Sequence, residues 1–317
     1  MMHRTRPRPK NIEFEITTAC NYRCLHCYCN AGSRSRYELL TEQIKSVIDQ
    51  LVEADAELLD IVGGEPLVRS DIYEILSYGH EKGLQMMMNT NASLVTKEVA
   101  KKLKSVCPDL LIGVSVDGPT PDVHEAVRGK GTFEKTMNGL RNLLDEGFDV
   151  TILFVVNALN YKYIDDMLEL AASLGTHLYV DRFVPVGRGL LHKGLLTPTS
   201  EQIESVARKL EAYEGPVTLF IEENISGGEC TAGRTHASIL VDGTVVPCGH
   251  FRYNPEFYMG NVNEKPFKEI WYSYNPDVLV PEKCTICPLY KTSCNAGCLA
   301  YSHLIYKDTD KLVCKTY

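Results

Sequence analysis

The chain has 317 residues, 44% of them apolar, and a formal net charge of −8 at pH 7. This length suffices for one large domain and a small one, and the apolar content can fill a sizeable core. The acidic balance argues against a nucleic-acid partner, because a domain that follows a phosphate backbone normally carries a basic face.

The N-terminus is basic, but no apolar run follows it that is long enough for a signal peptide or a membrane span. We therefore expect a cytoplasmic protein without a membrane segment. The basic run contains Arg4, Arg6, Arg8 and Lys10. It is expected to be a solvated end, with residues 1–11 flexible.

From residue 12 to residue 185, short β-branched apolar runs alternate with longer segments of helical spacing, which is the pattern of repeated βα units. The strands are predicted at residues 12–19, 57–64, 84–90, 110–118, 149–157 and 177–185. The helices between them are predicted at residues 41–54, 71–83, 96–106, 132–147 and 161–175. Because the strands are nearly continuous in apolar residues, we expect a parallel sheet buried on both faces, as in an α/β barrel or a doubly wound sheet. Six units fall short of a closed eight-unit barrel, and the chemistry of such a fold lies at the carboxyl ends of its strands.

The composition changes after a predicted helix at residues 200–213, and the chain then becomes rich in cysteine. We therefore divide it into a barrel over residues 12–215, a linker over 216–227 and a small α+β domain over 228–317. Within the small domain, residues 236–248 predict a β-hairpin, because an Asp-Gly pair at its centre suits the positive φ angles of a tight turn.

Four cysteines directly follow the first predicted strand, at Cys20, Cys24, Cys27 and Cys29. In a reducing compartment, metal or cluster ligation explains such a group better than disulfide bonds. Three closely spaced thiolates, at Cys20, Cys24 and Cys27, can hold three irons of a 4Fe-4S cluster and leave the fourth iron free. A structural zinc site is the alternative, with Cys29 or His26 as its fourth ligand.

The CxxxCxxC spacing after the first strand resembles that of the radical S-adenosylmethionine (radical SAM) superfamily. The resemblance extends to "GGEP" at residues 63–66, "VSVDG" at 114–118 and "VRGKGTF" at 127–133. It implies a partial (β/α)6 TIM-like barrel that binds S-adenosylmethionine (SAM) at the first cluster. A small departure is an Ala at position 92, where the family often has Gly. The residues that the resemblance places at the cofactor are His26, Gly63, Gly64, Glu65, Asn91, Ser115, Arg128 and Asn157.

The cysteines of the small domain resemble the SPASM extension, which carries two auxiliary 4Fe-4S clusters. By the pairing of that family, the nearer cluster would be held by Cys230, Cys248 and Cys298. The farther cluster would be held by Cys284, Cys287, Cys294 and Cys314. One departure is a spacing of six residues, where the family usually has five, between Cys287 and Cys294. The nearer cluster is one ligand short, which Glu229, a substrate thiolate or water would supply. The remaining cysteines, Cys29 and Cys107, are expected to be ordinary thiols.

The resemblance implies an enzyme that cleaves SAM reductively to a 5′-deoxyadenosyl radical and abstracts hydrogen from its substrate. A peptide or protein substrate is the first choice, with oxidation or cross-linking as the reaction, because most SPASM enzymes modify peptides. The first cluster motif begins at residue 20 and leaves no room for a leader-recognition domain before it, so we expect a separate peptide-recognition protein. An electron donor such as ferredoxin or flavodoxin is also implied.

Two alternatives remain open. "HCYCNAG" at residues 26–32 also resembles the haem-synthesis branch of this group, which would make the substrate a small molecule such as a tetrapyrrole side chain. The other alternative is a zinc-stabilised binding protein without radical chemistry. The sequence identifies no catalytic acid or base.

Overall fold

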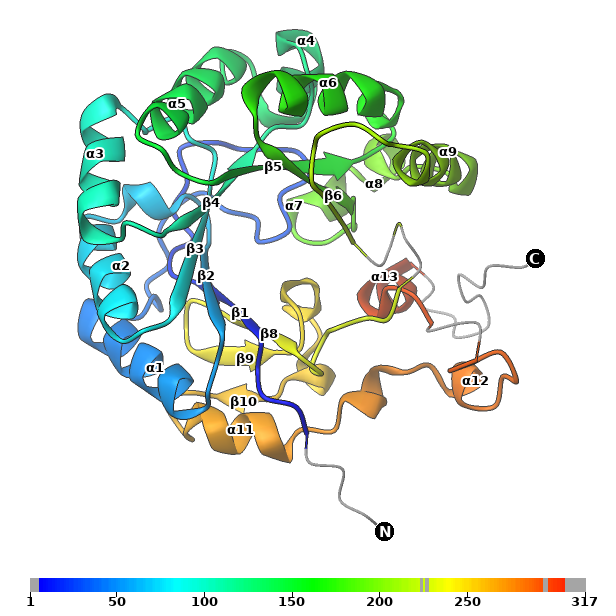
Figure 1. Ribbon diagram of the computed structural model, residues 1–317. Coiled ribbons are helices and arrows are strands. Elements are labelled where there is room, and N and C mark those ends of the chain that lie inside the picture. Colours follow the sequence, from blue (N-terminus) through cyan, green and yellow to red (C-terminus); the bar gives the residue numbers. More distant parts are fainter. Residues whose placement is uncertain (1–5, 223–224, 226–227, 293–295, 306–317) are drawn as a thin grey trace.

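The computed structural model describes residues 6–222, 225, 228–292 and 296–305. The described strands form one ten-stranded sheet in the order β10-β9-β8-β1-β2-β3-β4-β5-β6-β7. The sheet curves into an open barrel, and the longer helices lie on its outer side (Figure 1). The predicted α/β fold, a partial barrel built from βα units, is confirmed.

Seven consecutive strands run parallel to one another. They are β1 (Asn11–Glu15), β2 (Leu58–Val62), β3 (Gln85–Thr90), β4 (Leu111–Ser115), β5 (Val150–Val156), β6 (His177–Arg182) and β7 (Leu219–Ile221). The helices between them are α1 (Thr41–Glu53), α2 (Ile72–Glu81), α3 (Lys97–Val106), α4 (Pro121–Arg128), α5 (Phe133–Asp145), α6 (Ile164–Leu174), α7 (Arg188–Leu191), α8 (Lys193–Leu196) and α9 (Ser200–Glu211). The later elements are β8 (His236–Ile239), β9 (Thr244–Val246), β10 (Gly260–Asn261), α11 (Phe267–Ser273), α12 (Glu282–Thr285) and α13 (Leu299–Ile305).

Local sequence signals account for several helix ends. The Thr96 side chain accepts a hydrogen bond from the Val99 amide and so caps the first turn of α3. At the start of α9, Thr199 and Gln202 form a reciprocal capping box. Helix α6 ends at Gly175, whose φ of 66° lies in the left-handed region that favours glycine.

The two faces of the sheet differ in character. Alternate strand residues such as Phe14, Met88 and Phe154 are fully buried against the helices and form the main apolar core. The residues between them lie on the concave face and are mostly half-buried. The prediction of strands buried on both faces therefore holds for most of β2 and β4 but is wrong for the concave side of β1, β3, β5 and β6. This face keeps contact with solvent and carries polar side chains, Glu13 and Asn89 among them.

The predicted hairpin is present, and it extends the barrel sheet. Strand β8 pairs in parallel with β1, with Asn11 opposite His236, and β9 returns antiparallel to β8. At the other edge, β7 pairs in parallel with β6 inside the segment that was expected to be a linker. The proposed domain limits therefore fall within one continuous sheet.

The N-terminal segment, which was expected to be flexible over residues 1–11, makes specific contacts with the rest of the chain from residue 6 onward. The Arg6 guanidinium lies 4.0 Å from the centre of the Trp271 ring, and the Trp271 indole donates to the Pro7 carbonyl. Arg8 forms an ion pair with Glu57. Cation–π stacking and the indole hydrogen bond hold the segment against α11, and the Arg8 ion pair holds it beside the start of β2.

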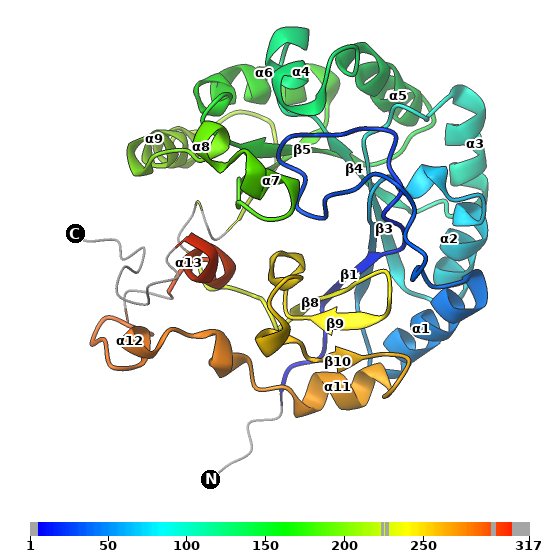
Figure 2. The same cartoon turned by 180° about the vertical axis from the view of Figure 1, so that it is seen from behind.

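The sheet ends at β7 on one edge and at β10 on the other, and α13 lies at the opening of the barrel (Figure 1 and Figure 2). The Arg182 guanidinium on β6 lies 3.9 Å from the centre of the Tyr301 ring and donates to its hydroxyl at 2.6 Å. The C-terminal region therefore contacts the barrel at both sides of the opening, through β8 on one side and α13 on the other.

Candidate active site

The first group of cysteines lies in the loop between β1 and α1, at the carboxyl ends of the strands. The loop is closed on itself, because the Cys20 amide donates to the Gly32 carbonyl at 2.9 Å. The Tyr22 amide donates to the Cys20 Sγ at 3.3 Å, and the Ala31 amide donates to the Cys27 Sγ at 3.2 Å. Backbone donors aimed at sulfur stabilise thiolate, the form that binds metal.

The thiols of this loop have different environments. A hydrogen bond with the Cys29 thiol, 3.6 Å from the Cys27 Sγ, lowers the pKa of Cys27 to about 5. Burial raises the pKa of Cys24 to about 12. A bound iron would displace the Cys24 proton, because metal ligation deprotonates thiols. Cys29 is buried between Cys27 and the Gly63 carbonyl, and its expected role as an ordinary thiol stays a prediction.

The "GGEP" segment packs directly on this loop. The Gly64 amide donates to the Thr17 carbonyl at 2.7 Å, and the Glu65 amide donates to the Ala19 carbonyl at 2.9 Å. A Cβ on Gly64 would lie 2.1 Å from the Ala19 oxygen, and one on Gly63 would lie 2.4 Å from the Thr17 oxygen. Only glycine permits this approach, so the two glycines fix the position of the cysteine loop.

The buried Glu65 carboxylate joins the ends of two strands. It accepts hydrogen bonds from the Thr90 hydroxyl at 2.7 Å and from the Asn91 amide at 2.8 Å. Burial raises the pKa of Glu65, and these bonds oppose the rise. The Asn91 side chain in turn donates to Asn21 in the cysteine loop at 2.9 Å. The structure therefore brings Glu65 and Asn91 together next to the predicted cluster site.

A buried carboxylate that the sequence reasoning set aside organises the opposite side of the loop. Asp117 follows β4 and is fully buried, and its Oδ2 lies 2.6 Å from Arg128 Nε and 3.0 Å from His26 Nε2. Although burial alone would raise the pKa of Asp117, Arg128 and His26 hold it well below its usual range. Arg128 Nη1 also lies 3.9 Å from the Cys24 Sγ. The Nδ1 atom of His26 is buried without a partner among the described residues, as expected where a bound group supplies one.

The remaining two predicted cofactor residues lie farther along the strand ends. Ser115 is the last residue of β4 and is half-buried. Asn157 follows β5 and is used within its own turn, where its Oδ1 accepts from the Leu159 amide and its Nδ2 donates to the Val155 carbonyl. The geometry of Asn157 therefore gives it a local structural role.

Four C-terminal cysteines share a small apolar cluster that also includes Phe251 and Leu279. They are Cys230, Cys248, Cys284 and Cys298. Burial raises the pKa of Cys248 and of Cys298, and neighbouring thiols of this group raise it further. Cys287, the next predicted ligand, is half-buried just beyond α12. Cys294 and Cys314 lie outside the described residues.

The fourth ligand of the nearer cluster was left open between Glu229, a substrate thiolate and water. Glu229 Oε1 lies 3.8 Å from Arg234 Nε, and the two side chains form an ion pair. The sequence reasoning did not consider His250, whose Nδ1 lies 3.6 Å from the Cys248 Sγ. The sequence signal that could have pointed to His250 is its position two residues after Cys248, a predicted cluster ligand.

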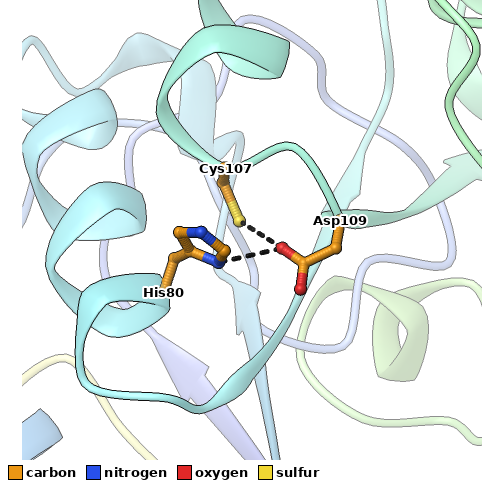
Figure 3. Close-up of side chains that lie close together, drawn as sticks. All are labelled: His80, Cys107 and Asp109. Carbon is orange, nitrogen blue, oxygen red and sulfur yellow. Dashed lines mark hydrogen bonds and ion pairs between the residues drawn. The ribbon is translucent and has the colours of Figure 1, made fainter.

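A separate group of side chains lies at the C-terminal ends of α2 and α3 (Figure 3). His80 Nδ1 lies 2.9 Å from Asp109 Oδ1, and the Cys107 thiol donates to the same oxygen at 3.7 Å. These atoms all lie within 4.8 Å of one another. Cys107 is the C-cap of α3, and the contacts account for this group as an ion pair that covers a helix end.

Comparison with known proteins gives the family. Residues 14–171 match the radical SAM superfamily, and residues 230–288 match SPASM, an iron-sulfur cluster-binding domain. Mycofactocin maturase MftC of Mycolicibacterium smegmatis is 33% identical over 309 residues, which cover 92% of this chain and 78% of the relative. The chain is a radical SAM enzyme with a SPASM domain. AdoMet-dependent heme synthase of Methanosarcina barkeri is similarly close, at 32% identity over 93% of this radical SAM enzyme and 92% of the relative.

Solved structures share the fold of this chain. Streptococcus suis SuiB bound to S-adenosylmethionine superposes with a TM-score of 0.74 at 18% identity and covers 92% of this chain and 73% of SuiB. For anSMEcpe with bound AdoMet, the TM-score is 0.71 at 20% identity, and the match covers 92% of this chain and 89% of anSMEcpe. Radical SAM enzymes with a SPASM domain use 4Fe-4S clusters and SAM. A zinc-stabilised protein without radical chemistry does not account for these matches.

The three thiols of the β1 loop fit a SAM-binding cluster, because amide donors already face two of them and a buried His26 nitrogen beside them lacks a partner. In the part of the radical SAM enzyme that the structure describes, no helix has the length and apolar character needed to cross a bilayer.

Proposed function

We propose that this radical SAM enzyme oxidises or cross-links a peptide or protein substrate on the concave side of its barrel. The observation that carries the proposal is the meeting of two cysteine-bearing loops. The ring of Tyr28, which follows Cys27, packs edge-on against the ring of His250, two residues after Cys248, with 5.6 Å between ring centres. A substrate on the concave face therefore lies next to both the radical source and the nearer auxiliary cluster.

The proposed metal ligands are the cysteines that the sequence singled out. They are Cys20, Cys24 and Cys27 for the SAM cluster, and Cys230, Cys248, Cys284, Cys287, Cys294, Cys298 and Cys314 for the auxiliary clusters. When bound, the reduced first cluster and SAM supply a 5′-deoxyadenosyl radical that takes a hydrogen atom from the substrate. The protein binds and orients both partners of this step. Gly63 and Gly64 fix the cysteine loop, and the Asp117 carboxylate holds Arg128 and His26 beside it.

Two observations support a peptide over a polycarboxylate tetrapyrrole. One is the relative named a maturase, at 33% identity. The other is the state of the cations near the concave face. Arg252 donates to both oxygens of Glu15, and Arg128 is paired with Asp117. Both arginines are therefore already neutralised by carboxylates of the protein.

The proposed reaction requires partners. One is a one-electron donor such as ferredoxin or flavodoxin, which reduces the first cluster. The other is a separate peptide-recognition protein that delivers the substrate. The second candidate function is radical modification of a tetrapyrrole side chain, which the similarity to AdoMet-dependent heme synthase favours.

A single incubation distinguishes the two functions. Enzyme that has been purified and reconstituted without oxygen is mixed with SAM, dithionite and either short peptides encoded beside its gene or iron coproporphyrin III. We expect 5′-deoxyadenosine release above the substrate-free rate, together with a mass change, with a peptide. A decarboxylated porphyrin with unchanged peptides would replace the proposal by the second candidate.

A further inference from the structure

Three neighbouring strands present polar side chains to the centre of the concave face. Glu13 on β1 lies opposite Asp60 on β2 in the parallel register. Asn89 on β3 donates from its Nδ2 to Asp60 Oδ2 at 2.8 Å. The residues on either side of Glu13, Ile12 and Phe14, are fully buried in the core behind the sheet. Because strand side chains alternate between faces, Glu13 points into the barrel.

Glu13 is held between the two cysteine-bearing loops. Its Oε1 accepts from the Tyr28 hydroxyl at 2.8 Å, and its Oε2 accepts from the Ser238 hydroxyl on β8 at 2.5 Å. A Cβ on Gly249, the residue after Cys248, would lie 2.9 Å from Glu13 Oε2. The carboxylate is thus next to the loop of the first cluster and the loop of the nearer auxiliary cluster, where a substrate must lie to react.

These carboxylates lack cationic partners. Among the described residues, no Lys, Arg or His nitrogen lies within the 4.0 Å of an ion pair from Glu13 or Asp60. Asp60 is only 7% exposed, yet its Oδ1 has no hydrogen-bond partner in the described structure. The Asn89 Oδ1 also lacks one. Burial and the charge of Glu13 raise the pKa of Asp60 to about 8.

Buried acceptors without donors are costly, and in native proteins they mark places where a ligand or water supplies the donor. Here Asp60 Oδ1 and Asn89 Oδ1 are acceptor atoms. Gly113 on β4 leaves room for the Asn89 oxygen, because a Cβ there would lie 2.1 Å from it. The acceptors are too few for a calcium-type site, which takes six to eight oxygens. A group with several N–H donors fits them better.

We propose that Glu13, Asp60 and Asn89 form a subsite that binds a cationic N–H donor group of the substrate, such as the ammonium of a lysine side chain. The inference rests on the proposed peptide function and names the substrate class more closely. The subsite anchors the substrate beside the Tyr28 and Gly249 loops, and it repels a polycarboxylate. The bound cation supplies the hydrogen bonds that the two oxygens lack and a positive charge beside Glu13 and Asp60, which opposes the rise in the pKa of Asp60 and favours its carboxylate form.

The test uses heptapeptide pools with randomised flanks and a central lysine, norleucine or glutamate. Norleucine keeps the four-carbon apolar stem of lysine and lacks its ammonium group. Reconstituted wild-type enzyme, Glu13→Gln, Asp60→Asn and the exposed control Glu98→Gln are assayed for 5′-deoxyadenosine release above the peptide-free rate. Iron content and the circular dichroism spectrum verify in each variant that the clusters and the fold are intact.

We expect the lysine pool to stimulate wild type and Glu98→Gln at least about tenfold more than the norleucine or glutamate pool, because hydrogen bonds to charged groups are strong. In Glu13→Gln and Asp60→Asn this preference should disappear, whereas Glu98→Gln should keep it. Equal stimulation by all pools, or a preference that survives both substitutions, would overturn the subsite and leave the peptide function intact. No stimulation by any pool, with or without turnover of iron coproporphyrin III, would contradict the proposed function and the subsite with it.

Discussion

The ion pair between Glu15 and Arg252 gives the sharpest test of how the small domain is attached to the barrel. Arg252 Nη1 and Nη2 lie 3.1 Å and 2.9 Å from the two Glu15 oxygens, and both side chains are at most 7% exposed. Glu15 ends β1, and Arg252 follows the Cys248 loop. Removing one partner of a buried pair leaves an uncompensated charge and costs about 3–5 kcal/mol. We therefore expect Arg252→Met to destabilise the enzyme by about that amount.

Replacing both partners, in Glu15→Gln with Arg252→Met, should recover most of this loss, since two neutral side chains leave no buried charge. At about 2 °C per kcal/mol for a chain of this size, the single variant should melt about 6–10 °C lower than wild type. Thermal unfolding of anaerobic, reconstituted protein measures both variants. An Arg252→Met midpoint within 1–2 °C of wild type, on the order of 0.5–1 kcal/mol by the same conversion, would refute the argument that this pair holds the Cys248 loop on β1.

Three further predictions concern the site. Gly64→Ala should lower iron content and SAM cleavage, because its Cβ would meet the Ala19 oxygen at 2.1 Å, whereas Gly194→Ala, with open space at that position, should match wild type in the same assays. Cys29→Ser should retain wild-type iron and Cys27→Ser should lose iron, and equal loss in both would make Cys29 a ligand. Asp60→Asn should gain stability relative to wild type as pH rises. Because the folded-state pKa of Asp60 is raised to about 8, the wild-type carboxyl stabilises the folded state fully below about pH 4. This stabilisation is lost towards pH 8, at up to about 1.4 kcal/mol per pH unit. If chemical denaturation gives the same difference in unfolding free energy between variant and wild type at pH 5 and at pH 8, the prediction is contradicted.

The sequence predicted the features that depend on local pattern. Apolar periodicity located the six main strands and five of the α-helices between them but not α4, and the spacing of Cys20, Cys24 and Cys27 located the candidate site. It did not predict β7, because three residues, Leu219–Ile221, are too few to show a period. Nor did it predict that β8 pairs with β1, since that contact joins segments more than 200 residues apart in the chain.

The polar concave face was missed although its signal was present. In "NIEFE" the acidic residues Glu13 and Glu15 alternate with Ile12 and Phe14, which indicates a strand with one apolar face. The packing of Arg6 against Trp271 was not predicted, for a different reason. Its stacking on Trp271 depends on a distant residue, and a basic run near a terminus normally indicates a solvated end.

Iron and labile-sulfide analysis of the anaerobically purified protein tests the central claim most directly. Wild type should contain about twelve irons per chain, and the variant with Cys20, Cys24 and Cys27 all changed to Ala should contain about eight, as expected for three four-iron clusters of which one is lost. About four irons in wild type, lost in the variant, would show that the C-terminal cysteines hold no clusters and would contradict the account.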